Sequence, residues 1–463
     1  MRDAATLWTS EEIALATGGT ASAPFDVSGV TFDSREVGPG DLFLALKGEA
    51  TDGHRFLDQA FAQGAAGAVV SEAAAHPHVL VSDTIAALDA LGIAARGRCA
   101  AKVIGVTGSV GKTGTKEALF AALDRPEPGT AHRSVKSYNN HTGVPLSLAR
   151  MPRSARFGVF EMGMNHAGEL AALTRLVRPH VAMVTTIAPA HMGFFESEAA
   201  IADAKGEIFQ GIEPGGTAII PFDSPHRDRL IEAAKPYAGA IMTFGNGDGA
   251  DYRAVEAMRT RTGGTFVTAR FGVRELSFTI AQPGAHWVSN AMGIIAAVDA
   301  VGGDLEMAGL ALAEMGGLAG RGARFLARLP EGEALVIDES YNANPASMRA
   351  TLDVLAQEPG RKIVVLGEMR ELGDHSQAFH AELSGPIEAA GVGYAILVGQ
   401  DMAPLAEALE GRIDFVHVAD ADTALARLES ILAPGDAVLV KGSNGVRLSA
   451  VVAALGTLRT CST

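Results

Sequence analysis

A glycine-rich loop at residues 107–113 is the strongest chemical feature of this sequence. It reads TGSVGKT and stands between an apolar stretch at 103–106, predicted to be a strand, and a helical pattern at 116–123. In such a loop, glycines let backbone N–H groups face phosphate oxygens, and the helix N-terminus adds its positive end. The sequence therefore predicts binding of a nucleotide triphosphate, most simply ATP. The loop residues predicted to contact it are Gly108, Ser109, Val110, Gly111, Lys112, Thr113 and Gly114.

Two side chains of the loop have distinct chemical roles. Lys112 can bridge the β- and γ-phosphates, and the Thr113 hydroxyl can hold Mg²⁺. The longer form of the motif has a glycine where this chain has Val106, so only the shorter TGxxGKT form is present. The alternative interpretation is an ordinary glycine-rich turn.

Glu161 directly follows the predicted strand at 158–160. The carboxyl ends of parallel strands form the edge at which such sheets bind ligands. A carboxylate there can complete the Mg²⁺ shell that Thr113 begins. A solvated glutamate that caps the next turn is the alternative.

His191 and Lys205 lie further along the chain. His191 follows the predicted strand at 181–186, and Lys205 lies on the predicted helix at 201–210. Taken singly, a histidine after a strand is more often structural, and a helical lysine is usually on the surface. A buried lysine can, however, lose its proton and react.

Short apolar strands alternating with helices are predicted to position these residues. This pattern is typical of parallel sheets covered on both faces, so the chain is predicted to be an α/β protein. We expect three domains: a small α/β domain at 1–84, a central P-loop domain at 85–317 and a doubly wound, Rossmann-like domain at 318–463. Besides those above, strands are predicted at 27–32, 41–47, 66–71, 217–221, 335–337, 363–366, 394–398, 415–418 and 437–440, a hairpin at 264–279, and helices at 54–63, 85–98 and 290–301.

The composition excludes several classes of protein. The 463 residues carry a formal net charge of -15, which argues against a nucleic-acid partner, because phosphate backbones need a cationic face. Cys99 and Cys461 are the only cysteines and give neither a disulfide framework nor a zinc spacing. We expect no secretory signal and no membrane span, because the sequence starts without an apolar segment and contains no apolar run of sufficient length. A cytoplasmic protein is predicted.

The order of these motifs resembles that of the Mur ligases, ATP-dependent amide ligases that build the peptide of the bacterial cell-wall precursor. The resemblance covers nearly the whole chain. Its motifs are FDSREVGPGDLFLALKG, TGSVGKT, SYNNHTGVPLSL, EMGMNHAGEL, APAHMGFF, ADAKGEIF, VIDESYNANPASM, VLGEMRELGDHS and LVKGSNGVRL. NNxxGVPLSL together with YNANPASM and LGEMRELG is similar to the member that adds D-alanyl-D-alanine to UDP-N-acetylmuramoyl-tripeptide.

The resemblance implies catalytic and metal-binding roles. Glu161, with Thr113, would bind Mg²⁺ beside the phosphates. His191 and Lys205 would hold a second Mg²⁺, with the lysine carbamoylated by CO₂. The implied catalytic residues are Lys112, Glu161, His191 and Lys205.

The resemblance also implies contacts to the substrates. Asn290 would lie near the adenine, and Arg321 and Asp338 would close on ATP from the last domain. The family usually has asparagine where this chain has Trp287. Ser34 and Arg35 would face the UDP-sugar; Asn139, Asn140, Asn342 and Asn344 are candidates for further substrate contacts, with a simple turn as the alternative for the NANP segment.

The implied reaction is acyl-phosphate ligation by a monomer. The tripeptide carboxylate would attack the γ-phosphate of ATP, and the amine of D-alanyl-D-alanine would then displace phosphate. Three rival hypotheses stay open: a sister ligase that adds a single amino acid, a polyglutamate ligase, and a P-loop switch or sensor that binds ATP without ligating anything.

Overall fold

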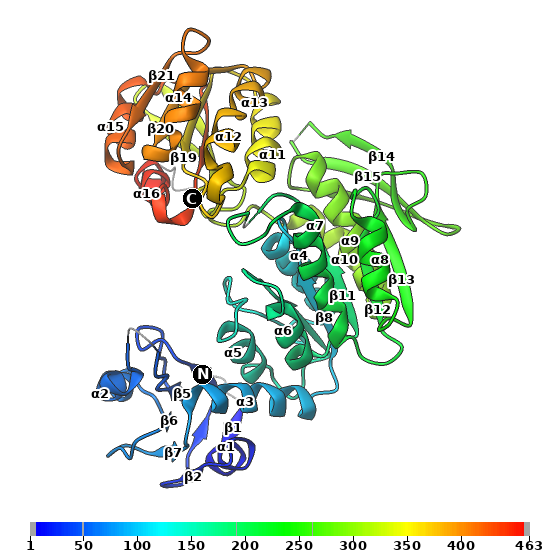
Figure 1. The fold of residues 1–463 in the computed structure, drawn as a ribbon, viewed down its shortest axis with the longest axis vertical. Helices are drawn as coiled ribbons and strands as arrows, with labels where there is room; N and C mark the ends of the chain where they lie inside the picture. Colours follow the sequence, from blue (N-terminus) through cyan, green and yellow to red (C-terminus); the bar gives the residue numbers. More distant parts are fainter. Residues whose placement is uncertain (1–5, 49–50, 191, 262, 458–463) are drawn as a thin grey trace.

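The computed structural model describes residues 6–48, 51–190, 192–261 and 263–457. Three bodies follow one another along the long axis of the molecule, with the N-terminal part at one end and the C-terminal part at the other (Figure 1). Each body is built around its own main sheet, and the three sheets contain five, nine and six strands. Within these described residues, no helix is long and apolar enough to cross a membrane.

The N-terminal body has a mostly parallel sheet with the order β2-β7-β6-β5-β4. The predicted strand at 27–32 is divided here, because its first part pairs with β1 and its second part joins the main sheet. The elements are β1 (Trp8–Thr9), α1 (Ser10–Thr17), β2 (Thr20–Ala21), β3 (Asp26–Val27), β4 (Gly29–Thr31), β5 (Asp41–Leu44), η1 (Gly53–Phe56), α2 (Leu57–Ala62), β6 (Gly67–Val70) and β7 (His78–Leu80).

Helix α3 (Thr84–Arg98) connects the first body to the second and packs on helix α5 (Gly143–Ala149). Its start is capped by Asp83, whose carboxylate accepts hydrogen bonds from two backbone N–H groups of the first turn. The indole of Trp8 donates a hydrogen bond of 2.9 Å to the Ala149 carbonyl. These contacts fix the N-terminal body against the central one.

The central sheet has the order β16-β15-β14-β13-β12-β11-β8-β10-β9 and is parallel from β9 to β14. The predicted hairpin at 264–279 is confirmed as the antiparallel pair β15–β16. Its elements are β8 (Lys102–Thr107), α4 (Lys112–Asp124), β9 (Ala131–Arg133), β10 (Phe157–Glu161), α6 (Glu169–Val177), β11 (Val181–Val184), α7 (Glu198–Gly206), η2 (Glu207–Gly211), β12 (Thr217–Pro221), α8 (Arg227–Ala234), β13 (Ala240–Gly245), β14 (Tyr252–Arg259), β15 (Thr265–Phe271), β16 (Arg274–Ile280), α9 (Ala285–Ala300) and α10 (Leu305–Glu314).

Two apolar cores sandwich this sheet. Ile104 and Val106 of β8 face the core shared with α4, α9 and α10, whereas Val103 faces the core shared with α5, α6, α7 and α8. Side chains of successive strand residues point to opposite faces, so an uninterrupted apolar strand supplies both cores. Strand β8 is thereby held between β10 and β11, and the loop after it starts from a rigid position.

The C-terminal sheet has the order β17-β18-β22-β19-β20-β21. Five strands are parallel, as predicted, whereas the edge strand β17, which was not predicted, is antiparallel to β18. The elements are β17 (Ala323–Leu329), β18 (Gly332–Glu339), α11 (Pro345–Ala356), β19 (Lys362–Gly367), η3 (Gly373–His375), α12 (Ser376–Ala381), α13 (Ser384–Ala389), β20 (Val392–Val398), η4 (Gln400–Met402), α14 (Ala403–Leu409), β21 (Phe415–Val418), α15 (Ala421–Ile431), β22 (Ala437–Lys441), η5 (Asn444–Val446) and α16 (Ser449–Thr457).

Candidate functional site

The glycine-rich loop leaves β8 at the carboxyl edge of the central sheet. Gly108 has φ +148°, and a Cβ there would overlap the Thr185 hydroxyl. Gly111 has φ +88° and is the residue before α4. The backbone N–H of Ser109 donates a hydrogen bond of 2.7 Å to the Thr186 carbonyl, so the loop is tied to the segment after β11. These two positions therefore require glycine, as the phosphate-loop prediction assumes.

Lys112 begins α4, and its ammonium donates a hydrogen bond of 2.6 Å to the Gly108 carbonyl. Burial lowers the pKa of Lys112, the carboxylate of Glu161 raises it, and the guanidinium of Arg321 lowers it further. The Lys112 side chain therefore lies over its own loop, near the guanidinium of Arg321 from the C-terminal body. Two cations around one loop favour a ligand with several negative charges.

Glu161 joins the loop to a second segment of the central body. Its carboxylate accepts hydrogen bonds of 2.9 Å from the Thr113 hydroxyl and 2.8 Å from the Asn139 amide. Its side chain is buried, so the alternative of a solvated glutamate is wrong. A hydroxyl and a carboxylate at hydrogen-bond distance form the all-oxygen donor set that Mg²⁺ prefers. These residues therefore fit a magnesium ion beside the phosphate loop.

Lys205 is buried on α7, so the alternative of a surface lysine is wrong. Burial lowers the pKa of Lys205 well below its ordinary value, and the charge of Lys112 lowers it further. A neutral amine is the form that reacts with CO₂, so the environment fits the carbamate prediction. His191 lies outside the described residues, and in the part of the chain that is described no three acidic, histidine or cysteine side chains form a metal cluster.

A cavity of about 320 Å³ lies between the phosphate loop and the C-terminal body. It brings together predicted residues from both bodies, which are far apart in the sequence. The central body contributes Ser109, Val110, Gly111, Lys112, Gly114, Asn139, Glu161 and Asn290, and the C-terminal side contributes Arg321, Asn342 and Asn344. The two bodies therefore share one site.

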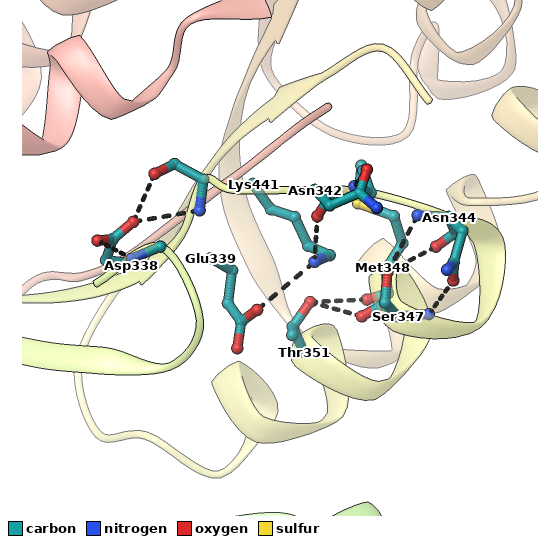
Figure 2. Close-up of polar contacts among 11 residues, drawn as sticks. Asp338, Glu339, Asn342, Asn344, Ser347, Met348, Thr351 and Lys441 are labelled. Carbon is teal, nitrogen blue, oxygen red and sulfur yellow. Dashed lines mark hydrogen bonds and ion pairs between the residues drawn. The ribbon is translucent and has the colours of Figure 1, made fainter. Parts of the chain in front are cut away.

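Arg321 reaches across this boundary. Its guanidinium lies 4.1 Å from the centre of the Tyr341 ring and donates a hydrogen bond of 3.2 Å to the Ser137 hydroxyl of the central body. Asp338 is nearby but outside the lining, because its carboxylate accepts hydrogen bonds from the Gly320 backbone N–H at 2.7 Å and from Ser340 (Figure 2). Asp338 thus shapes the turn that carries Arg321.

Some predicted substrate residues have local structural partners. Asn140 lies just before α5, and its side-chain oxygen accepts a hydrogen bond of 2.9 Å from the N–H of Gly143, the first residue of that helix. Asn344 is the N-cap of α11, where its side-chain oxygen accepts a hydrogen bond of 2.9 Å from the Ser347 N–H, and it also lines the cavity. Helix capping therefore accounts for the NANP segment without excluding a substrate contact.

Ser34 and Arg35 do not line the cavity. Both lie in the N-terminal body, where the guanidinium of Arg35 forms an ion pair with Asp33. The same segment is joined to the central body by an ion pair between Glu36 and Lys136, which precedes Ser137 of the cavity lining. The predicted sugar-facing residues therefore lie beside the site rather than in it.

Glu339 and Lys441 line the cavity but were not among the predicted residues. They end the neighbouring parallel strands β18 and β22 and lie side by side in the register (Figure 2). The ammonium of Lys441 donates a hydrogen bond of 3.0 Å to the Asn342 carbonyl and lies 3.6 Å from the Glu339 carboxylate. The strand-end argument that selected Glu161 applies to Lys441, which directly follows the predicted strand at 437–440, whereas Glu339 lies two residues beyond the end of the predicted strand at 335–337.

Family models match three consecutive parts of the chain. They are described as "Mur ligase family, catalytic domain" at residues 26–107, "Mur ligase middle domain" at 106–298 and "Mur ligase, glutamate ligase domain" at 324–444. A curated relative from Escherichia coli (strain K12), UDP-N-acetylmuramoyl-tripeptide–D-alanyl-D-alanine ligase, is 35% identical over 96% of this chain and 97% of its own. The chain belongs to the Mur ligase family.

Solved structures agree with this assignment. Crystal structure I of MurF from Acinetobacter baumannii has a TM-score of 0.84 and 33% identity, and the match covers 97% of this chain and 98% of the other. The MurF ligase from Thermotoga maritima, solved in complex with ADP, has a TM-score of 0.77 and 25% identity over 93% of this chain and 97% of its own. The three-body architecture is therefore that of the Mur ligases.

Trp287 lies in the first turn of α9. A Cβ on Gly114 would lie 3.0 Å from the indole Cη2 of Trp287, so the ring lies directly against the first turn of α4. Asn290, three residues later, lies beside Gly111. The indole therefore fills the space next to the phosphate loop and leaves Asn290 to face it.

Proposed function

We propose that this Mur ligase joins D-alanyl-D-alanine to the terminal carboxylate of UDP-N-acetylmuramoyl-tripeptide and uses ATP to activate that carboxylate. The observation that carries the proposal is the nearly full-length match to a relative that bears this name. The shared cavity supports it, because a ligase needs a phosphate site and an acceptor site in contact. A protein that only binds ATP, such as a switch or sensor, does not require the polar side chains that the C-terminal body contributes to the cavity.

The first chemical step is activation of the carboxylate. Direct condensation of a carboxylate with an amine is unfavourable, so the carboxylate oxygen attacks the γ-phosphorus of ATP and ADP leaves, which gives an acyl phosphate. Lys112 and Arg321, on opposite sides of the cavity, are placed to neutralise charge on the phosphoryl group. Positioning and charge stabilisation of this kind provide most of the catalysis in phosphoryl transfer.

Thr113 and Glu161 would hold one Mg²⁺, and a carbamoylated Lys205 with His191 would hold a second. Bound magnesium supplies positive charge that offsets the phosphate oxygens. Asn139 keeps the Glu161 carboxylate oriented through its amide hydrogen bond of 2.8 Å. Burial of Lys205 favours the uncharged amine that carbamoylation requires.

The second step forms the amide. The uncharged amine of D-alanyl-D-alanine attacks the acyl carbon, the C–N bond forms, and phosphate leaves with the electron pair of the C–O bond. One proton is lost when the ammonium becomes the nucleophile, and the other passes to the departing phosphate. Asn342 and Asn344, which line the C-terminal wall, are candidates to orient the dipeptide.

The proposal assigns separate tasks to the three bodies. Residues 1–84 would bind the UDP-sugar through Ser34 and Arg35, residues 85–317 would bind ATP, and residues 318–463 would present the dipeptide. We propose a monomer that acts in the cytoplasm, where ATP is available.

Phosphate release with omission of each substrate tests the proposal. Turnover should require ATP, UDP-N-acetylmuramoyl-tripeptide and D-alanyl-D-alanine together. Release that persists without the dipeptide, or that accepts a single amino acid or glutamate in its place, would refute the assignment in favour of a sister ligase or a polyglutamate ligase.

A further inference from the structure

An oppositely charged pair on the C-terminal wall of the cavity has no role in the ATP chemistry above. Glu339 ends β18 and Lys441 ends β22, and the two residues are register partners in the parallel sheet. Both lie at the carboxyl edge of that sheet, where ligands of α/β folds bind. Both line the same cavity as Lys112.

The two side chains satisfy each other only in part. Lys441 is 2% exposed, and its ammonium donates a hydrogen bond of 3.0 Å to the Asn342 carbonyl. The Glu339 carboxylate is 3.6 Å away, beyond an ordinary hydrogen bond (Figure 2). Burial raises the pKa of Glu339 and lowers that of Lys441, so each charged form lacks the stabilisation that water would give. An ammonium has three N–H donors, so Lys441 can bind a further acceptor.

The signs of these charges select the kind of ligand. A phosphate chain would gain from Lys441 but would be repelled by Glu339, whereas Lys112 and Arg321 offer it two cations with a metal site. A small zwitterion matches both members of the pair. Its carboxylate replaces the hydration that Lys441 has lost, and its ammonium does the same for Glu339.

We propose that Glu339 and Lys441 form the subsite for the two charged ends of the incoming dipeptide, with Lys441 bound to its carboxylate and Glu339 to its ammonium. This assignment rests on the proposed function, which makes a free dipeptide the acceptor. The Asn342 carbonyl fixes the Lys441 side chain, and the Asn344 side chain lies on the same wall. The subsite therefore recognises the dipeptide by its charges and not by its methyl groups.

The test compares D-alanyl-D-alanine with its C-terminal amide, which lacks the negative charge. Truncating one member of a desolvated charge pair weakens binding by about 30-fold or more. For the unaltered enzyme, the KM of the amide should therefore exceed that of the acid by at least about 30-fold. In Lys441→Gln, which keeps a donor for the Asn342 carbonyl, the acid and the amide should differ by less than about threefold.

Two further variants isolate the effect of the charge. Glu339→Gln/Lys441→Gln removes both charges, leaves neither unpaired, and gives the same comparison if the single variant does not fold. Lys235→Gln, on an exposed lysine at the end of α8, is the matched control and should behave as the unaltered enzyme. The KM values of ATP and of UDP-N-acetylmuramoyl-tripeptide should stay within about threefold in all variants.

Each outcome decides the matter. Loss of discrimination between acid and amide in Lys441→Gln, with the other KM values unchanged, supports the subsite. Retained discrimination, or an equal rise in the KM of all three substrates, overturns the subsite and leaves the proposed function standing. If the unaltered enzyme does not use the dipeptide at all, the proposed function fails and the subsite fails with it.

Discussion

The phosphate loop can be tested with two glycines that share one backbone conformation. Gly111 and Gly129 both have φ +88°. A Cβ added at Gly111 would lie 3.0 Å from the Asn290 amide, whereas a Cβ added at Gly129 would have no atom within 4 Å. An L-residue in the left-handed region costs about 1–2 kcal/mol. Gly111→Ala and Gly129→Ala should therefore share this cost, and only Gly111→Ala should disturb the cavity.

The magnitude follows from that difference. Relaxing the strain at Gly111 moves the N–H groups that face the phosphates, so about 1.4 kcal/mol of loop strain corresponds to a roughly tenfold weaker ATP affinity. Calorimetric titration with a non-hydrolysable ATP analogue measures it, and thermal unfolding of each variant gives the shared backbone cost. Equal ATP affinities for the two variants would refute the reasoning, because ATP binding would then not depend on the backbone conformation at Gly111.

Three other predictions concern buried ionisable groups. Glu161→Gln should raise the Mg²⁺ concentration for half-maximal turnover by about 10- to 100-fold, and an unchanged magnesium dependence would exclude Glu161 as a ligand. Lys205→Ala should abolish turnover, with partial rescue by a small carboxylate; near-normal turnover would contradict the carbamate. Burial lowers the pKa of His132 to about 4. As the pH falls, the unfolded chain therefore protonates this histidine at a higher pH than the folded protein does. The free energy of unfolding should decrease by up to about 3 kcal/mol between pH 6.5 and about 4. His132→Gln should show a smaller loss in thermal unfolding across this range.

Strand periodicity was the most reliable information in the sequence. Apolar runs such as 217–221 and 437–440 coincide with β12 and with nearly all of β22, because a strand that is buried on both faces is apolar along its whole length. Strand β17 was missed, since most of its residues are partly or fully exposed and its antiparallel pairing with β18 depends on tertiary structure. Edge strands of this kind carry little local signal.

The sequence predicted those site residues whose roles can be inferred from their neighbours in the chain. The loop motif and the strand-end position of Glu161 are readable from neighbouring residues. The burial of Lys205 is not, because a helical lysine between Asp203 and Glu207 has the sequence of a surface position and is buried only when α7 packs on the sheet. Lys441 was overlooked although it directly follows the predicted strand at 437–440.

A cavity shared by two bodies makes closure part of the chemistry. Its volume of about 320 Å³ is at the lower end for a ligand site, yet ATP, the tripeptide end and the dipeptide must meet there. Polar contacts between the two bodies include Arg321 to Ser137, the Gly193 N–H to the Glu371 carbonyl at 2.9 Å, and Arg259 to Glu358 at 2.9 Å. Boundaries between domains commonly allow relative motion, and the Gly320 and Gly322 backbone, both at positive φ, provides a point of rotation. Substrates must therefore enter a more open arrangement, and closure brings Arg321 and the C-terminal wall to the phosphate loop.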